Sequence, residues 1–161
     1  MEIYILRHAI AEDHRPGRRD QDRALTDEGR RKLGPVLERA RAAGVAPSLI
    51  LTSPYVRAVQ TAEIAAEALG YKGTLVRTET LVPGSVPQAA WLEIREHRGE
   101  KAILLAGHEP LLSALAAYLL GAPELAIDFK KGALLRLDVD ASAREPHGTL
   151  EWLLTPKLAG A

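Results

Sequence analysis

An imidazole stands beside a guanidinium at the end of the first apolar run of the chain. Arg7 and His8 directly follow the run 3–6, whose composition is typical of a buried strand. In open α/β sheets, ligands bind just outside the carboxyl ends of the strands. A histidine at that place can attack phosphorus, and an arginine there can hold phosphate oxygens in bidentate fashion. The pair therefore points to phosphoryl chemistry.

Two later apolar runs are followed by groups of the same kind. The run that ends at Leu51 leads into Ser53 and Pro54, which predict a helix with Ser53 as its N-cap and Pro54 as its first residue. Arg57 then lies about one turn into that helix. A third run leads through a glycine turn to His108. We expect the three strand ends to bring two arginines and two histidines together in a pocket suited to a phosphate dianion.

Each of these residues has a simpler explanation when it is taken alone. His8 could be a surface histidine, and Arg57 could pair with Glu63 or Glu67 on one helix face, because most charged residues are simply solvated. Three strand ends in one order favour a joint site instead. The remaining histidines lie in polar surroundings without metal-ligand spacing: His14, His97 and His147. We therefore expect neither a metal site nor a cofactor.

Composition narrows the class of protein. A chain of 161 residues predicts a single domain over 1–161. Its net charge is zero, which argues against a nucleic-acid binder. The absence of cysteine excludes a thiolate nucleophile and a disulfide framework. With neither a signal peptide nor a run of transmembrane length, we expect a cytoplasmic protein without membrane association. The absence of asparagine fits a thermophilic source, and a GC-rich genome would produce much of the same bias.

Hydrophobic periodicity supplies the elements that must position the site. Strands are expected over 3–6, 49–52, 74–77, 102–106, 133–139 and 149–153, and helices over 27–43, 54–69, 87–97 and 109–120. This alternation predicts an α/β fold, a three-layer α/β/α sandwich whose sheet is mostly parallel and ends in an antiparallel edge hairpin. The long polar segment 9–25 is expected to be a functional or mobile loop.

The ordered set of motifs resembles the histidine phosphatase superfamily, and most closely its small SixA-type phosphohistidine phosphatases. The matching pieces, from residue 1 to about 120, are Leu6-Arg7-His8-Ala9, Leu25-Thr26 with Gly29, Ser53-Pro54 with Arg57-Ala58 and Gln60-Thr61-Ala62, and Gly107-His108. The resemblance implies a phosphoglycerate mutase-like fold. It also implies that His8 is the phosphorylated nucleophile and that Arg7, Arg57 and His108 bind the phosphoryl group. Ala9 replaces the glycine usual in the wider superfamily.

No residue aligns clearly with the acid of the mutase-like branch, so two proton donors are open. Glu109 follows His108 directly, as an acid does in the phytase-like branch. Glu79 occupies the loop region where the mutase-like branch carries its acid. Either could instead be structural, since an acid in the first turn of a helix is favourable in itself. We favour Glu109, because it adjoins His108 in the chain.

The resemblance implies a phosphohistidine phosphatase that acts in signal transduction through a phospho-His8 intermediate and needs no metal. The chain has no insertion of domain size, which predicts an open pocket fit for a phosphorylated side chain of a protein. The loop 9–25 is its expected contact surface, through Arg15, Arg18, Arg19 and Arg23. One alternative is a small-molecule phosphomonoesterase of the same superfamily. Another is a phosphoprotein-binding module without turnover, against which the intact His8 speaks.

Overall fold

A six-stranded sheet in the order β3-β2-β4-β1-β5-β6 is the middle layer of the computed structural model, which describes residues 1–161. Its strands are β1 (Glu2–Arg7), β2 (Leu49–Thr52), β3 (Val76–Arg77), β4 (Ala102–Gly107), β5 (Leu134–Asp138) and β6 (Thr149–Leu154). The first four are parallel, whereas β5 runs antiparallel to β1 and forms a hairpin with β6. The expected α/β fold with an antiparallel edge hairpin is therefore confirmed.

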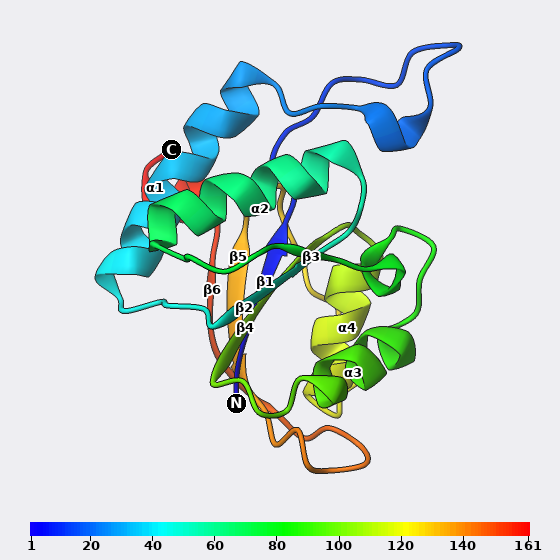
Figure 1. The fold of residues 1–161 in the computed structure, drawn as a ribbon, viewed down its shortest axis with the longest axis vertical. Helices are drawn as coiled ribbons and strands as arrows, with labels where there is room; N and C mark the ends of the chain where they lie inside the picture. The colour runs from blue at the N-terminus through cyan, green and yellow to red at the C-terminus, as the bar shows by residue number, and fades with distance from the viewer.

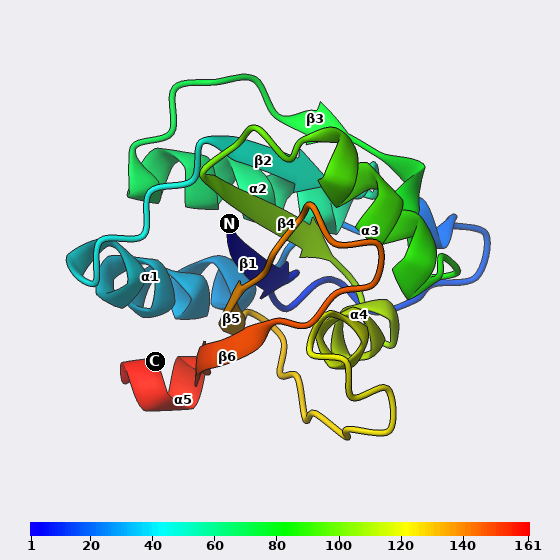
Figure 2. The same cartoon turned by 90° about the horizontal axis from the view of Figure 1, so that it is seen from below.

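Helices cover both faces of this sheet (Figures 1 and 2). On one face lie α1 (Asp27–Ala42), α2 (Val56–Leu69) and the short α5 (Pro156–Ala159), and on the other lie α3 (Pro87–Glu96) and α4 (Leu111–Leu119). Alternate side chains of β1 pack on opposite faces of the sheet, because successive residues of a strand point in opposite directions. Ile3 and Ile5 join the apolar core with α3 and α4, and Tyr4 and Leu6 join the core with α1 and α2.

The first helix begins where the sequence predicts. Thr26 is the N-cap of α1, and its hydroxyl oxygen accepts a hydrogen bond of 3.0 Å from the amide of Gly29. Gly29 also lets the helix approach the end of β1, since a Cβ at this position would collide with the carbonyl oxygen of Ile10. Gly44 follows the helix with φ +84°, a left-handed conformation that glycine adopts without strain.

The predicted start of α2 is wrong. The helix begins at Val56 with Tyr55 as its N-cap, so Ser53 and Pro54 precede it and Arg57 is its second residue. Ser53 Oγ instead accepts from the amide of Tyr55, before the helix, and contacts His108 Nε2. The sequence analysis also missed the short helix α5. None of the helices is long and apolar enough to cross a membrane.

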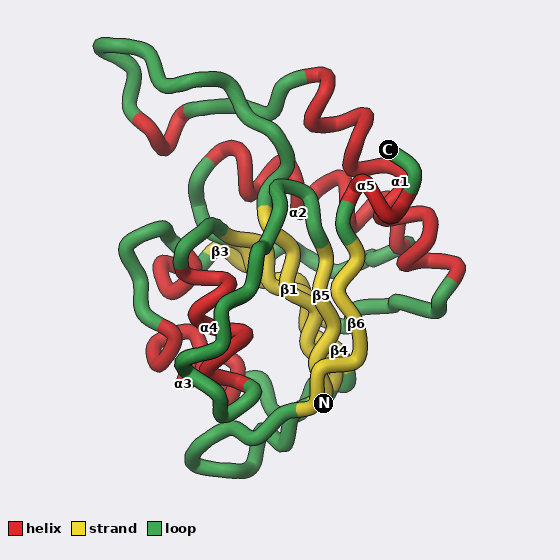
Figure 3. The backbone as a smooth tube through the Cα atoms, turned by 180° about the vertical axis from the view of Figure 1, so that it is seen from behind, coloured by secondary structure: helices red, strands yellow, loops and turns green.

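The segment 9–25 leaves the sheet at the carboxyl end of β1 and extends as a long excursion (Figures 1 and 3). It contains a short 3-10 helix, η1 (Asp20–Asp22), and an isolated bridge joins Ala11 to Leu25 near its base. A second 3-10 helix, η2 (Glu79–Leu81), follows β3. The η1 turn contacts α2, which brings the loop back over the carboxyl ends of the parallel strands.

Candidate active site

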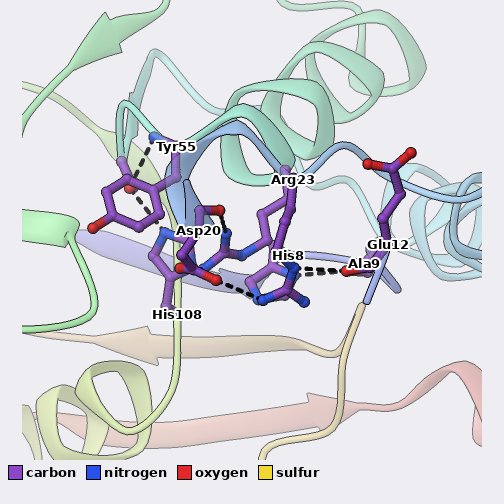
Figure 4. A network of polar contacts seen from close by, with 9 residues as sticks. His8, Ala9, Glu12, Asp20, Arg23, Tyr55 and His108 are labelled. Atoms are coloured by element: carbon purple, nitrogen blue, oxygen red, sulfur yellow. Dashed lines mark hydrogen bonds and ion pairs between the residues drawn. The ribbon is translucent and has the colours of Figure 1, made fainter. Parts of the chain in front are cut away.

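The three predicted strand ends meet at one place. His8 follows β1 and its amide donates to the carbonyl oxygen of Gly107 at the end of β4, at 3.0 Å. The imidazoles of His8 and His108 lie with their ring centroids 5.0 Å apart (Figure 4). Arg57 reaches the same place from the first turn of α2 and is only 4 % exposed. The structure therefore brings His8, Arg57 and His108 together, with Arg7 beside them on β1.

The contacts of His8 fix its tautomer. Its Nδ1 lies 2.7 Å from the carbonyl oxygen of Ala9. A carbonyl can only accept, so Nδ1 carries the hydrogen and Nε2 keeps its lone pair. Burial lowers the pKa of His8 to about 4, and the charges of Arg57 and Arg7 act in the same direction. At neutral pH the ring is uncharged, which is the form that can attack phosphorus.

His108 has one ring nitrogen without a partner. Its Nε2 lies 2.8 Å from Ser53 Oγ, and that oxygen accepts from the amide of Tyr55 at 3.3 Å. In the tautomer in which the Ser53 hydroxyl donates to Nε2, the ring hydrogen lies on Nδ1. This Nδ1 is buried and has no partner. Burial, followed by the neighbouring charges of His8 and Arg57, lowers the pKa of His108 to about 2.

Both arginines are held by backbone carbonyl oxygens and keep further N–H donors free. Arg7 Nη1 donates to the carbonyl of Phe129 at 2.6 Å, and Arg57 Nη1 donates to that of Asp20 at 2.8 Å. The Nε of each arginine is buried without a partner. Buried donors rarely stay unpaired. Together with His108 Nδ1, these atoms make three of the four unpaired buried polar side-chain atoms of the chain, and an oxyanion would satisfy such donors.

Side chains from the first two turns of α2 form hydrogen bonds with both the end of β1 and the end of the loop 9–25. Thr61 Oγ1 accepts from the amide of Ala9 at 3.1 Å and donates to the carbonyl oxygen of Arg57 at 2.7 Å. The side-chain oxygen of Gln60 accepts from the amide of Leu25 at 2.8 Å. These contacts explain why Gln60-Thr61 accompanies Arg57 in the sequence motif: one face of α2 holds both the end of β1 and the end of the loop.

The sequence analysis missed Asp20. Its Oδ2 accepts from Arg57 Nη2 at 2.9 Å and its Oδ1 from Arg23 Nη1 at 2.6 Å (Figure 4). Burial raises the pKa of Asp20, but the hydrogen bonds from Arg23 and Arg57 outweigh it and the pKa is lowered overall. Asp20 is therefore ionised and serves as the counter-charge of Arg57. The sequence held one indication of such a residue: an arginine that follows a buried strand is expected to be buried, and a buried guanidinium needs an acidic partner.

The two candidate acids lie at different places. Glu109 precedes α4, and its Oε1 accepts from the amide of Ser113 at 2.8 Å. Its charge also acts on Arg7, although burial is the larger influence and lowers the pKa of that arginine. Glu79 is exposed in η2 and lines, with Tyr55, a hollow of about 300 Å³. The ring of Tyr55 packs against His108, with the ring centroids 5.1 Å apart.

Comparisons with known proteins agree with this geometry. Residues 3–81 match the sequence model of the histidine phosphatase superfamily (branch 1). An uncharacterised protein of Picosynechococcus sp. is 34% identical over an alignment of 161 positions. The alignment covers 96% of this chain and 94% of that protein.

Solved structures share the fold. The protein histidine phosphatase SixA, solved with tungstate, superposes with a TM-score of 0.89 at 24% identity, and 98% of each chain is covered. A mycobacterial glucosyl-3-phosphoglycerate phosphatase superposes with a TM-score of 0.72 at 17% identity, over 93% of this chain and 96% of that one.

Proposed function

The chain belongs to the histidine phosphatase superfamily, and from this premise we propose that it removes phosphate from a phosphohistidine of a protein through a phospho-His8 intermediate. The observation that carries the proposal is the state of His8. Its ring is buried and neutral, and Nδ1 is held by the carbonyl of Ala9. A free Nε2 lone pair beside two guanidiniums is the arrangement that attack on a phosphoryl group requires.

In the first step, Nε2 of His8 attacks phosphorus while the bond from phosphorus to the substrate nitrogen breaks. Charge spreads over the three equatorial oxygens in the transition state. The guanidiniums of Arg7 and Arg57 and the Nδ1 hydrogen of His108 supply donors for these oxygens. Because the donors are already in place in a buried site, little reorganisation accompanies the reaction.

In the second step, water attacks phosphorus in line with Nε2 of phospho-His8. The bond between Nε2 and phosphorus breaks, inorganic phosphate leaves and the neutral imidazole is restored. The departing substrate imidazole of the first step takes up a proton, and we assign Glu109 as its donor because the residue adjoins His108. The carboxyl of Glu109 would have to exchange its hydrogen bond to the Ser113 amide for one to the leaving group.

No metal has a role in this scheme, because two guanidiniums supply the positive charge that a cation would otherwise provide. Full activity is therefore expected in the presence of EDTA, measured as phosphate release. Loss of activity on chelation, restored by a divalent cation, would contradict this part of the scheme.

The choice of a protein substrate is supported by the likeness to SixA along the whole chain and by the absence of an inserted domain over the pocket. The fold shared with a glucosyl-3-phosphoglycerate phosphatase favours one alternative, a small-molecule phosphomonoesterase.

The phospho-His8 intermediate is tested by incubating the protein with a phosphodonor. The phosphate that stays on the protein is then measured after acid treatment and after alkali treatment. The parent should carry a phosphate that is labile to acid and stable to base, and His8→Ala should carry none. Turnover of phosphohistidine peptides, compared with a panel of sugar and nucleotide phosphates, tests the substrate class. Undiminished turnover in His8→Ala would exclude the nucleophile. Efficient hydrolysis of one metabolite above all phosphohistidine peptides would favour the alternative.

A further inference from the structure

A basic cleft of about 670 Å³ opens beside Arg7, between α1, the segment 128–132 and the start of α5. Five of its lining residues are cationic: Arg7, Lys32, Lys130, Lys131 and Lys157. Asp128 is the only acid among them. The chain as a whole has no net charge, so this concentration of positive charge is local. A cleft lined by charges of one sign attracts ligands of the opposite charge.

Two of the lysines have no carboxylate partner. Lys32 pairs with Glu28 and Lys130 pairs with Asp128, each at 2.7 Å. Lys131 and Lys157 form no ion pair, and Lys131 is exposed in the turn before β5. Arg7 and Ala9, the residues on either side of His8 in the chain, both line the cleft. The cleft is thus continuous with the phosphoryl site through Arg7.

The floor of the cleft is apolar. Ile10, Leu33 and Pro156 line it together with Ala9. A small, fully charged ligand would gain nothing from these side chains, whereas a peptide that carries both apolar and acidic residues would contact the floor and the lysines at once. The combination of apolar floor and cationic rim therefore fits an amphipathic segment.

The loop 9–25, which the sequence analysis expected to contact the substrate, has a different charge state. Three of its four arginines are paired with acids of the same loop: Arg18 with Glu12, Arg19 with Asp22 and Arg23 with Asp20. Only Arg15 lacks such a partner. The loop therefore neutralises itself, and the unpaired positive charge lies in the cleft.

We propose that the cleft binds an acidic, amphipathic segment of the phosphoprotein substrate next to its phosphohistidine, with Lys131 and Lys157 facing the acidic side chains and the partly exposed Ile10 and Pro156 facing the apolar ones. This inference rests on the proposed function, because it extends the same site. It moves the docking surface from the loop 9–25 to the cleft and makes an acidic flank a determinant of specificity.

Two phosphohistidine peptides test the inference, one flanked by Glu and Leu at helical spacing and the other with every Glu replaced by Gln. The parent should have a kcat/KM about tenfold higher for the acidic peptide, as expected for two ion pairs at a partly exposed surface. In the double variant Lys131→Ala, Lys157→Ala this ratio should fall to about one. The double variant Arg18→Ala, Arg19→Ala removes the same charge from the loop and should keep the ratio of the parent.

Binding of the same peptides without phosphate, followed by fluorescence anisotropy, gives a measurement that does not depend on turnover. The acidic peptide should bind the parent more tightly than its Gln counterpart, and the lysine variant should lose the difference. Equal binding of both peptides, or equal losses in the loop variant, would overturn the inference. So would lysine-dependent binding of inorganic tripolyphosphate without binding of the acidic peptide. If the acidic peptide binds but phosphohistidine is not hydrolysed, the cleft stands and the proposed function falls.

Discussion

Asp20 determines how the phosphate-binding guanidinium of Arg57 is presented. The backbone carbonyl and the carboxylate of this one residue each accept one hydrogen bond from the Nη groups of Arg57. This orients the guanidinium and leaves the buried Nε and the second hydrogen of each Nη for an oxyanion. Asp20 itself is held by Arg23 from the same loop. Asp20 is thus a positioning residue: it acts through Arg57 and not on the phosphorus.

Asp20→Asn is expected to lower kcat/KM for p-nitrophenyl phosphate about tenfold, since the amide can still accept a hydrogen bond from Arg57 but removes the counter-charge of that buried guanidinium. Asp22→Asn is the matched control: it removes a carboxylate of the same turn that pairs with the exposed Arg19, and activity should not change. A rate increase in Asp20→Asn would instead mean that the carboxylate competes with substrate for Arg57.

Glu109→Gln separates proton donation from the structural role of this residue. An amide keeps the hydrogen bond to the Ser113 amide but cannot give up a proton. Hydrolysis of alkyl phosphates, whose leaving groups need protonation, should slow about a hundredfold. Hydrolysis of p-nitrophenyl phosphate should change little. Glu79→Gln should affect neither substrate, and the reverse pattern would make Glu79 the donor.

At the scale of the element, α1 reaches the site only because residue 29 lacks a side chain. Gly29→Ala should force α1 away from Ile10 and lower the free energy of unfolding by about 1–3 kcal/mol, the range for overpacking. Gly34→Ala in the same helix meets no atom beyond its chain neighbours, but residue 34 precedes Pro35, whose ring disfavours a helical residue with a Cβ before it. Its effect on the free energy of unfolding should therefore be smaller than that of Gly29→Ala. Urea titration of both variants checks this pair, and equal effects would contradict it.

Features that depend on local sequence were predictable, whereas those that depend on contacts between distant residues were not. Apolar runs that end in His8, Arg57 and His108 are local patterns, so the sequence was enough to identify the strands and to bring these residues to one edge. The start of α2 was not predictable from local sequence: Ser53 is a good N-cap in isolation, but in the fold its hydroxyl contacts His108, which is distant in the chain, and the helix begins at Val56. Asp20 was hidden for a similar reason, because a loop rich in acids contains no periodicity that shows which carboxylate folds back onto α2.

At the scale of the whole molecule, two neutral buried imidazoles make stability depend on pH. The unfolded chain binds protons on His8 and His108 near pH 6.5, whereas the folded chain does so only near the lowered pKa values of about 4 and about 2. The unfolded state therefore binds more protons below pH 6.5, and stability falls as the pH falls.

Between pH 7 and pH 5 the free energy of unfolding should decrease by about 2 kcal/mol for each of the two histidines. Urea titrations across this range measure the decrease. In His8→Gln the decrease should be about half that of the parent, and an unchanged pH dependence would show that His8 is protonated equally well in the folded protein.

The place of β1 in the sheet also sets the order of events during synthesis. This strand leaves the ribosome before its two neighbours in the sheet, β4 and β5: Glu2 pairs with Ala102 on one side and with Asp138 on the other. Pairings so distant in the chain form slowly and late. A nascent chain therefore carries His8 at the end of an unpaired apolar strand, a state prone to aggregation, until β4 and β5 have emerged. The proposed site is assembled only then, when His108 follows β4 into place beside His8.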